Sequence, residues 1–194
     1  MGKGDQTREA VLEFASARAC TVGLEGLSIG TLAKELHMSK SGLFAHFQSK
    51  SALQVQVLEH ASDRFVEEVI RPALRAPRGE ARVRALFGLW IAWFHRQEHG
   101  CIFVAAITEL DDRPGDARDA LASQQRDWLD VIETVTATGV ATGEFRADLD
   151  TRQFALDLYS IALMLHLTVR LLALPDAIPR ADTAFENLLN GARA

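Results

Sequence analysis

The segment HRQEH, at positions 95–99, carries the residue types best suited to chemistry. Its H-x-x-E-H order places His95 and His99 on one face of a helix, with Glu98 as a possible base, as in inverted zinc-protease motifs. Only three positions are fixed, however, Gly100 ends the helix directly afterwards, and no third metal ligand is evident. We therefore favour a solvated helix end with histidines near its negative pole, and keep a metal-dependent hydrolase as the alternative.

The two cysteines add no second reactive centre. Cys20 and Cys101 both lie in apolar helical surroundings, without a CxxC pattern or a His/Cys metal spacing. A disulfide is not expected, and inert packing is favoured over oxidant sensing for Cys101, whose one cationic neighbour would be His99. The sequence predicts no cofactor and no metal.

The elements that could position functional side chains are clearest over Leu27–Leu53, where two short helices and a third are predicted. Ser28 and Ser39 stand at the N-cap positions of the first two helices, whose apolar residues recur at helical spacing. A tight turn at 37–38 joins them. This pattern predicts a helix-turn-helix.

Small, polar and cationic side chains are expected on the outer face of the second helix, near its N-terminus. That end of a recognition helix is directed at base edges and phosphates. The residues that we expect to contact DNA are Ser28, Thr31, Ser39, Lys40, Ser41, Gly42, Phe44, His46 and Lys50.

The first quarter of the chain resembles the TetR family of bacterial repressors. The matching residues, in the order and spacing of the family, are Arg8, Val11, Leu12, Ala15, Gly23, Leu27, Ser28, Ile29, Leu32, Ala33, Met38, Ser39, Lys40, Leu43, Phe47, Lys50 and Leu53. Two positions depart from it. Phe44 stands where the family usually has a phosphate-binding Tyr, and His37 stands at a turn that usually carries Gly, where a positive φ is expected. The resemblance implies a dimer whose two heads bind successive major grooves of double-stranded operator DNA.

Charge is distributed unevenly along the chain. The net charge is −5, but residues 1–50 contain six Lys and Arg against five Asp and Glu, which gives +1, and the remainder carries −6. A head so nearly neutral must bind DNA through a few well-placed cations and backbone N–H groups, doubled by dimerisation.

No targeting or membrane segment is expected. The N-terminus lacks the apolar core of a signal peptide. The long apolar stretch Phe154–Leu174 contains Asp157, His166 and Arg170, so a buried helix is favoured over a membrane span. We expect a cytoplasmic protein.

Strand signals are almost absent, and the spacing of apolar residues and breakers predicts an all-α fold of about nine helices. Residues 1–49 form the predicted head, and residues 50–194 form a larger effector-binding and dimerisation body. Outside the helix-turn-helix, the predicted helices are Thr7–Val22, Lys50–Leu74, Glu80–Glu98, Cys101–Leu110, Asp116–Ala141, Asp150–Ala173 and Ala181–Ala192, with a linker between Pro175 and Pro179.

The last two long helices, Asp150–Ala173 and Ala181–Ala192, are the homodimer interface that the resemblance implies. The former is apolar nearly all round, whereas a surface helix needs only one apolar stripe. Burial against its own body and against a partner would explain the pattern.

Large aromatic residues concentrate in the body. Any one of them is most simply a core residue, but together they suggest a cavity lined by rings. The residues that we expect to bind a small, mainly apolar effector are Trp90, Trp93, Phe94, Phe103, Glu109, Trp128, Tyr159 and His166. The sequence thus predicts a dimeric transcriptional repressor without catalytic activity; a structural helical dimer without DNA affinity is a further alternative.

Overall fold

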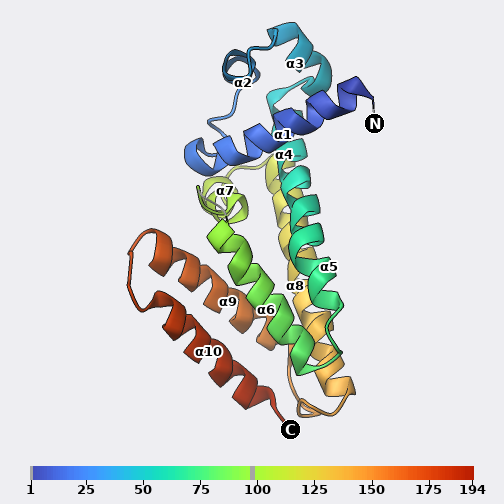
Figure 1. Ribbon diagram of the computed structural model, residues 1–194, viewed down its shortest axis with the longest axis vertical. Helices are drawn as coiled ribbons and strands as arrows, with labels where there is room; N and C mark the ends of the chain where they lie inside the picture. Colours follow the sequence, from blue (N-terminus) through green and yellow to red (C-terminus); the bar gives the residue numbers. More distant parts are fainter. Residues whose placement is uncertain (1, 97–98) are drawn as a thin grey trace. The chain divides into compact units, whose positions relative to one another are not determined.

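The computed structural model describes residues 2–96 and 99–194 (Figure 1). Apart from one antiparallel bridge between Phe145 and Arg193, the regular structure in those ranges is helical. The helices are α1 (Lys3–Val22), α2 (Ile29–Glu35), α3 (Lys40–Phe47), α4 (Lys50–Phe65), a π-helical turn η1 (Val66–Ile70), α5 (Arg71–Leu74), α6 (Glu80–Arg96), α7 (Ile102–Leu110), α8 (Asp116–Ala141), α9 (Thr151–Arg170) and α10 (Ala177–Ala192). Because α4, η1 and α5 follow one another without a break, the described part of the chain forms nine helical bodies, and the all-α prediction is confirmed.

The chain divides into two compact units. The first comprises Met1–Arg64 with Gln97–Gln124, and the second comprises Phe65–Arg96 with Gln125–Ala194. Both α4 and α8 therefore contribute residues to both units. The predicted functional boundary after residue 49 does not coincide with these divisions and stays a prediction.

Local signals in the sequence account for the limits of the first helices. Gly23 ends α1 with a φ of 76°, and its N–H donates to Ala19 O at 2.9 Å. The side chain of Ser28 caps α2, and that of Ser39 caps α3. His37 adopts a φ of 53°, so the turn between α2 and α3 has the left-handed conformation expected from the sequence.

The core of the first unit brings together one face of each helix in it. Leu43 and Phe47 of α3 are fully buried there, beside Leu53 and Leu58 of α4. At seven and eight residues, α2 and α3 are too short to be stable alone, so this core holds them in place.

In the second unit, α9 and α10 run side by side (Figure 1). Phe185 of α10 stacks on Phe87 of α6, with 4.1 Å between ring centroids. No described helix is long and apolar enough to cross a membrane.

Several predicted limits were wrong. The helix α10 begins at Ala177, not at Ala181, and the predicted linker between Pro175 and Pro179 is largely helical. Pro179 is the third residue of α10, where the missing N–H has no intrahelical partner to lose. The helix α1 begins at Lys3 rather than Thr7, and α9 ends at Arg170 rather than Ala173.

Candidate DNA-binding site

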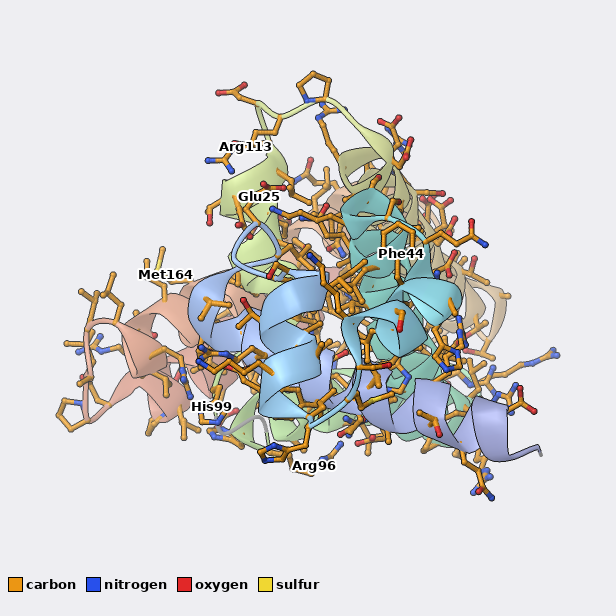
Figure 2. All side chains as sticks on the ribbon, turned by 90° about the horizontal axis from the view of Figure 1, so that it is seen from above. Glu25, Phe44, Arg96, His99, Arg113 and Met164 are labelled. Atoms are coloured by element: carbon orange, nitrogen blue, oxygen red, sulfur yellow. The ribbon has the colours of Figure 1, made fainter. Side chains whose placement is uncertain are left out.

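The helix α3 has one buried face and one exposed face. Leu43 and Phe47 have no exposed surface, whereas Phe44 is 53% exposed (Figure 2). Lys40 and Ser41, in the first turn, are also exposed, and His46 is half-buried. The first turn of α3, with its small, polar and cationic side chains, is therefore exposed on the surface of the first unit.

Three of the predicted DNA-contacting hydroxyls also serve as helix caps or partners of caps. Ser28 Oγ accepts from the Thr31 N–H at 3.0 Å and donates to Thr31 Oγ1 at 2.8 Å. Ser39 Oγ accepts from the Gly42 N–H at 3.1 Å. A Cβ added at Gly42 would lie 2.9 Å from Ser39 Oγ, so a side chain at this position would disturb the cap.

Lys50 lies against the turn that precedes α2. Its Nζ donates to Glu25 O at 2.6 Å and lies 3.0 Å from Glu25 Oε2. Hydrogen bonds from Gln54 and from Lys50 lower the pKa of Glu25, and the charge of Arg113 acts in the same direction. Figure 2 shows Glu25 and Arg113 on the same side of the unit. An ammonium has three N–H donors, and these contacts with Glu25 use two of them.

Glu109, which the sequence places among the effector-binding residues, contacts the same turn. Its carboxylate accepts from the Leu24 N–H at 2.8 Å and from the Glu25 N–H at 2.9 Å. Phe103, another of those residues, packs against the core of the first unit. Sequence patterns did not indicate this use of Glu109, because its backbone partners lie 85 and 84 positions away.

The other expected effector-binding residues belong to the second unit. Trp128 meets the Trp90 ring edge-on, with centroids 5.0 Å apart, and meets Phe65 at 4.8 Å. Trp93 meets Phe65 in the same way at 5.5 Å, and Trp90 lies 5.5 Å from Tyr159. The three tryptophans are each less than 10% exposed, so the structure gathers these rings into one buried cluster.

Phe94 and His166 lie beside this cluster in the second unit. The Phe94 ring meets His166 edge-on at 5.1 Å and is tilted against Trp90 at 5.8 Å. Burial, together with the charge of Arg170, lowers the pKa of His166. The neutral imidazole is therefore favoured there.

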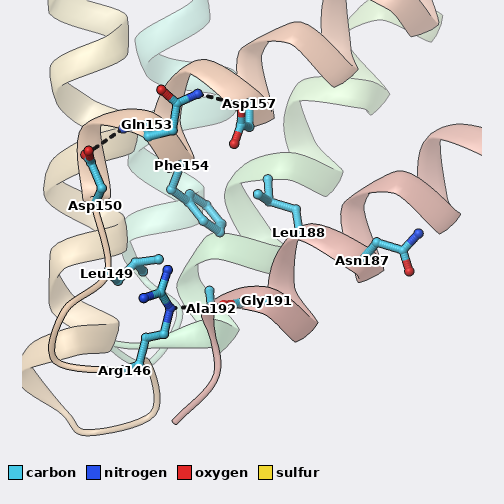
Figure 3. Close-up of a pocket in the computed structure, with 10 residues that line it drawn as sticks. All are labelled: Arg146, Leu149, Asp150, Gln153, Phe154, Asp157, Asn187, Leu188, Gly191 and Ala192. Atoms are coloured by element: carbon cyan, nitrogen blue, oxygen red, sulfur yellow. Dashed lines mark hydrogen bonds between the residues drawn. The ribbon is translucent and has the colours of Figure 1, made fainter.

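Two hollows in the second unit were not indicated by the sequence. One, of about 220 Å³, lies between the start of α9 and the end of α10, where Arg146 Nε donates to Gly191 O at 3.2 Å (Figure 3). The other, of about 390 Å³, is an apolar groove along α9 and α10. Its lining includes Met164 and Leu165 of α9 and Ala181 of α10. Met164 is 56% exposed and projects from α9 (Figure 2).

The HRQEH segment is only partly described. His95 and His99 are exposed, and Glu98 lies outside the described residues. Among the residues that the structure describes, no group of three or more His, Cys, Asp or Glu side chains is placed to hold a metal ion.

Comparison with known protein families assigns both parts of the chain. Residues 15–57 match the family of bacterial regulatory proteins known as the tetR family, and residues 79–185 match the tetracyclin repressor-like C-terminal domain. The second match alone covers more than half of the 194 residues. The chain belongs to the TetR family. It is therefore a transcriptional regulator with a DNA-binding helix-turn-helix, in a family that is not enzymatic, and the hydrolase alternative is not retained.

Individual TetR-family proteins are similar over most of the chain. The transcriptional repressor KstR2 of Mycolicibacterium smegmatis is 26% identical over 152 residues, which are 74% of this chain and 69% of KstR2. A TetR regulator from Chloroflexus aurantiacus has the same fold, with a TM-score of 0.85 at 24% identity, over 98% of this chain and 96% of that one. The structure of AibR in complex with isovaleryl coenzyme A and operator DNA gives a TM-score of 0.71 at 20% identity, over 96% and 97%.

The TetR family assignment and the compact units divide the chain differently. The helix α7 lies within residues 79–185, which match the C-terminal domain of the family. In the structure, α7 belongs to the compact unit that contains the helix-turn-helix. Glu109 is thus a residue of the matched C-terminal domain that binds backbone N–H groups within residues 15–57, which match the DNA-binding part of the family.

Proposed function

We propose that this protein is a homodimeric repressor that binds a palindromic operator in double-stranded DNA and releases it when a small, mainly apolar molecule binds the body. The arrangement of α3 supports this most directly. Leu43 and Phe47 are buried, the opposite face with Phe44 is exposed, and Ser39 caps the N-terminus of the helix. A capped N-terminus with an open polar face is the geometry that reads a major groove.

The proposed contacts fall into two groups. Lys40, Ser41, Gly42, Phe44 and His46, on the open face and first turns of α3, would meet base edges or the groove walls. Ser28, Thr31, Ser39 and Lys50, at helix N-termini, would meet phosphates. The first group sets sequence preference, whereas the second positions the head.

Dimerisation would use α9 and α10. Met164 and Leu167 of α9 and Ile178 of α10 are each at least 40% exposed in the single chain. The groove of about 390 Å³ runs along the same helices. A second copy of the chain would bury these side chains, and a stable interface of this kind buries more than about 1,000 Å² in total. The paired bodies would then hold two heads at the spacing of one operator.

Release by an effector would depend on the buried ring cluster of the second unit. Trp90, Trp93, Phe94, Trp128 and Tyr159 supply apolar walls, with His166 as a polar group. AibR, which has the same fold, has been seen with both isovaleryl coenzyme A and operator DNA, so one fold can carry both ligands. An effector releases the operator only if it binds the DNA-incompetent arrangement more tightly. Such a regulator acts in the cytoplasm, where its operator lies.

Selection from a random DNA library with the full-length protein tests the central claim. We expect an enriched palindrome, bound as two heads per site, with an affinity that falls as salt is raised. A variant in which Lys40, Ser41 and His46 are all replaced with Ala should lose the sequence preference while remaining a folded dimer. A folded wild-type dimer that enriches no sequence would instead support the structural-dimer alternative.

A further inference from the structure

The turn between α1 and α2, residues Gly23–Gly26, is held by side chains from two other helices in addition to two backbone hydrogen bonds, from Gly23 N–H to Ala19 O at 2.9 Å and from Leu27 N–H to Leu24 O at 3.2 Å. Glu109 of α7 accepts from the Leu24 and Glu25 N–H groups at 2.8 and 2.9 Å. From α4, Gln54 Nε2 donates to Leu24 O and to Glu25 Oε1, both at 2.9 Å. Lys50, also of α4, donates to Glu25 O at 2.6 Å. The two N–H groups are thus bound by α7, and the two carbonyls are bound by α4.

The approach of Glu109 depends on a glycine. Gly23 has a φ of 76°, and an added Cβ would lie 2.5 Å from Glu109 Oε1 and 2.8 Å from Oε2. The next two N–H groups, those of Leu24 and Glu25, both donate to one carboxylate, as in a backbone anion site. Here the anion is a side chain of the same chain.

This turn determines where α2 begins. Leu24 and Leu27 are 1% and 2% exposed, and Ser28 caps α2 directly after them. A helix of seven residues cannot set its own position, because isolated helices shorter than about 12 residues are marginal. The placement of α2, and of α3 which packs on it, therefore depends on the hydrogen bonds that fix Leu24 and Glu25 as well as on the apolar core of the first unit.

We propose that Glu109 is a positioning residue for operator binding, which holds the helix-turn-helix in its DNA-competent arrangement through the Gly23–Gly26 turn. The proposal rests on the proposed function as a DNA-binding regulator. It takes Glu109 out of the expected effector-binding set and gives α7 a specific role. The residues of α7 lie within the match to the C-terminal domain of the family. A displacement of α7 relative to the turn would therefore be transmitted to the helix-turn-helix by the Glu109 carboxylate.

Removal of the carboxylate should be measured against a matched glutamate. Glu144, in the second unit, likewise accepts a backbone N–H, that of Glu80 at 3.0 Å, and likewise lies against a glycine of positive φ, Gly79. The variants are Glu109→Ala, Glu109→Gln and Glu144→Ala, each as the full-length dimer. Gln is included because it fills the same space but can accept only one of the two N–H bonds with its oxygen.

Fluorescence anisotropy with the DNA site selected by the wild-type protein gives the affinity. We expect Glu109→Ala to bind about tenfold or more weakly, as follows if about one tenth of the molecules retain the competent arrangement. The log–log salt slope should stay unchanged, since no phosphate contact is lost. Hydrogen exchange should accelerate at the Leu24 and Glu25 amides. Glu144→Ala should keep wild-type operator affinity.

Each result supports or overturns the proposal. Wild-type affinity in a folded Glu109→Ala dimer, or in Glu109→Gln if the Ala variant does not fold, would overturn it. An equal loss of affinity in Glu144→Ala would also overturn it, because a general loss of stability would then explain the effect. If the wild-type protein binds no DNA, the proposed function itself is refuted. If the wild type binds DNA and the Glu109 variant binds it equally well, only the role of Glu109 is refuted.

Discussion

Glu80 joins the start of α6 to the C-terminus of the chain within the second unit. Its carboxylate accepts from Arg84 Nε at 2.7 Å and from Arg193 Nε and Nη2 at 2.8 and 2.7 Å. Arg84 also binds Glu186 of α10 at 2.8 Å through Nη2. The hydrogen bonds from Arg193 and then from Arg84 outweigh burial and lower the pKa of Glu80 from 4.5 to about 2. This network attaches α10, half of the proposed dimer face, to α6.

The size of the effect follows from the pKa of Glu80. One pKa unit corresponds to about 1.36 kcal/mol, so lowering the pKa from 4.5 to about 2 contributes roughly 3 kcal/mol to the free energy of unfolding at pH 7. The side chain is 18% exposed, and Gln would keep one acceptor. We therefore expect Glu80→Gln to lower the free energy of unfolding by about 2 kcal/mol at pH 7, and Tm by roughly 4–8 °C.

The pH dependence of this loss is the sharper test. A depressed carboxyl pKa stabilises the folded state fully above the unfolded-state value of 4.5, and that stabilisation disappears as the pH falls toward 2. The free energy of unfolding can be measured by urea unfolding, followed by circular dichroism, at pH 7 and at pH 3. More than roughly half of the difference in this free energy between the wild type and Glu80→Gln should be lost at pH 3. Glu67→Gln, which removes a largely exposed pair with Arg71, should change stability by less than about 0.5 kcal/mol. A Glu80→Gln loss of the same size at both pH values would show that packing, not charge, is responsible.

Three further outcomes are expected. Phe44→Tyr should tighten operator binding by about 0.5–1.5 kcal/mol per head in anisotropy, because the exposed ring would regain a phosphate-binding hydroxyl; weaker binding would mean that the ring meets an apolar base group. Lys50→Ala should reduce the log–log slope of operator affinity against salt by about 0.9 per head, because the N–H donor of Lys50 that is not bound to Glu25 would no longer contact a phosphate. An unchanged slope would mean that Lys50 binds Glu25 but no phosphate. Met164→Asp should weaken the dimer by about 2–4 kcal/mol in sedimentation equilibrium, because the symmetric interface would bury two carboxylates, and an unchanged dimer would place the interface elsewhere.

The end of α1 and the starts of α2 and α3 could be predicted because they depend on neighbours in the sequence. Ser28 and Ser39 bind N–H groups three residues away, and Gly23 ends its own helix. The left-handed conformation of His37 was expected in the same way, from the turn that it occupies. Pro179 misled the prediction, since a proline indicates a break in most places but is accepted in the first turn of a helix.

The contacts of Glu109 and Glu80 could not be predicted, because their partners are far away in the sequence. Glu109 reaches amides 85 and 84 positions away, and Arg193 reaches Glu80 over 113 positions. Helical spacing gives the face on which a side chain lies but not what packs against that face. The aromatic residues show the same limit: their burial was expected, whereas the contacts of Trp93 and Trp128 with Phe65, and of Trp90 with Trp128, depend on tertiary packing.

The charge of the head determines which contacts matter most for the proposed function. Residues 1–50 carry only +1, Arg18 lies 3.4 Å from Glu35, and Lys50 lies 3.0 Å from Glu25. Few cationic side chains are then available to neutralise phosphates and release counterions from the DNA. The salt-dependent part of the binding free energy is therefore small. Most of the affinity must come from short-range contacts of α3 and of helix N-termini, repeated in the second head. Such contacts are lost together when the helix-turn-helix shifts. A carboxylate that fixes the Gly23–Gly26 turn, as we propose for Glu109, would therefore affect operator affinity as much as a residue that contacts DNA.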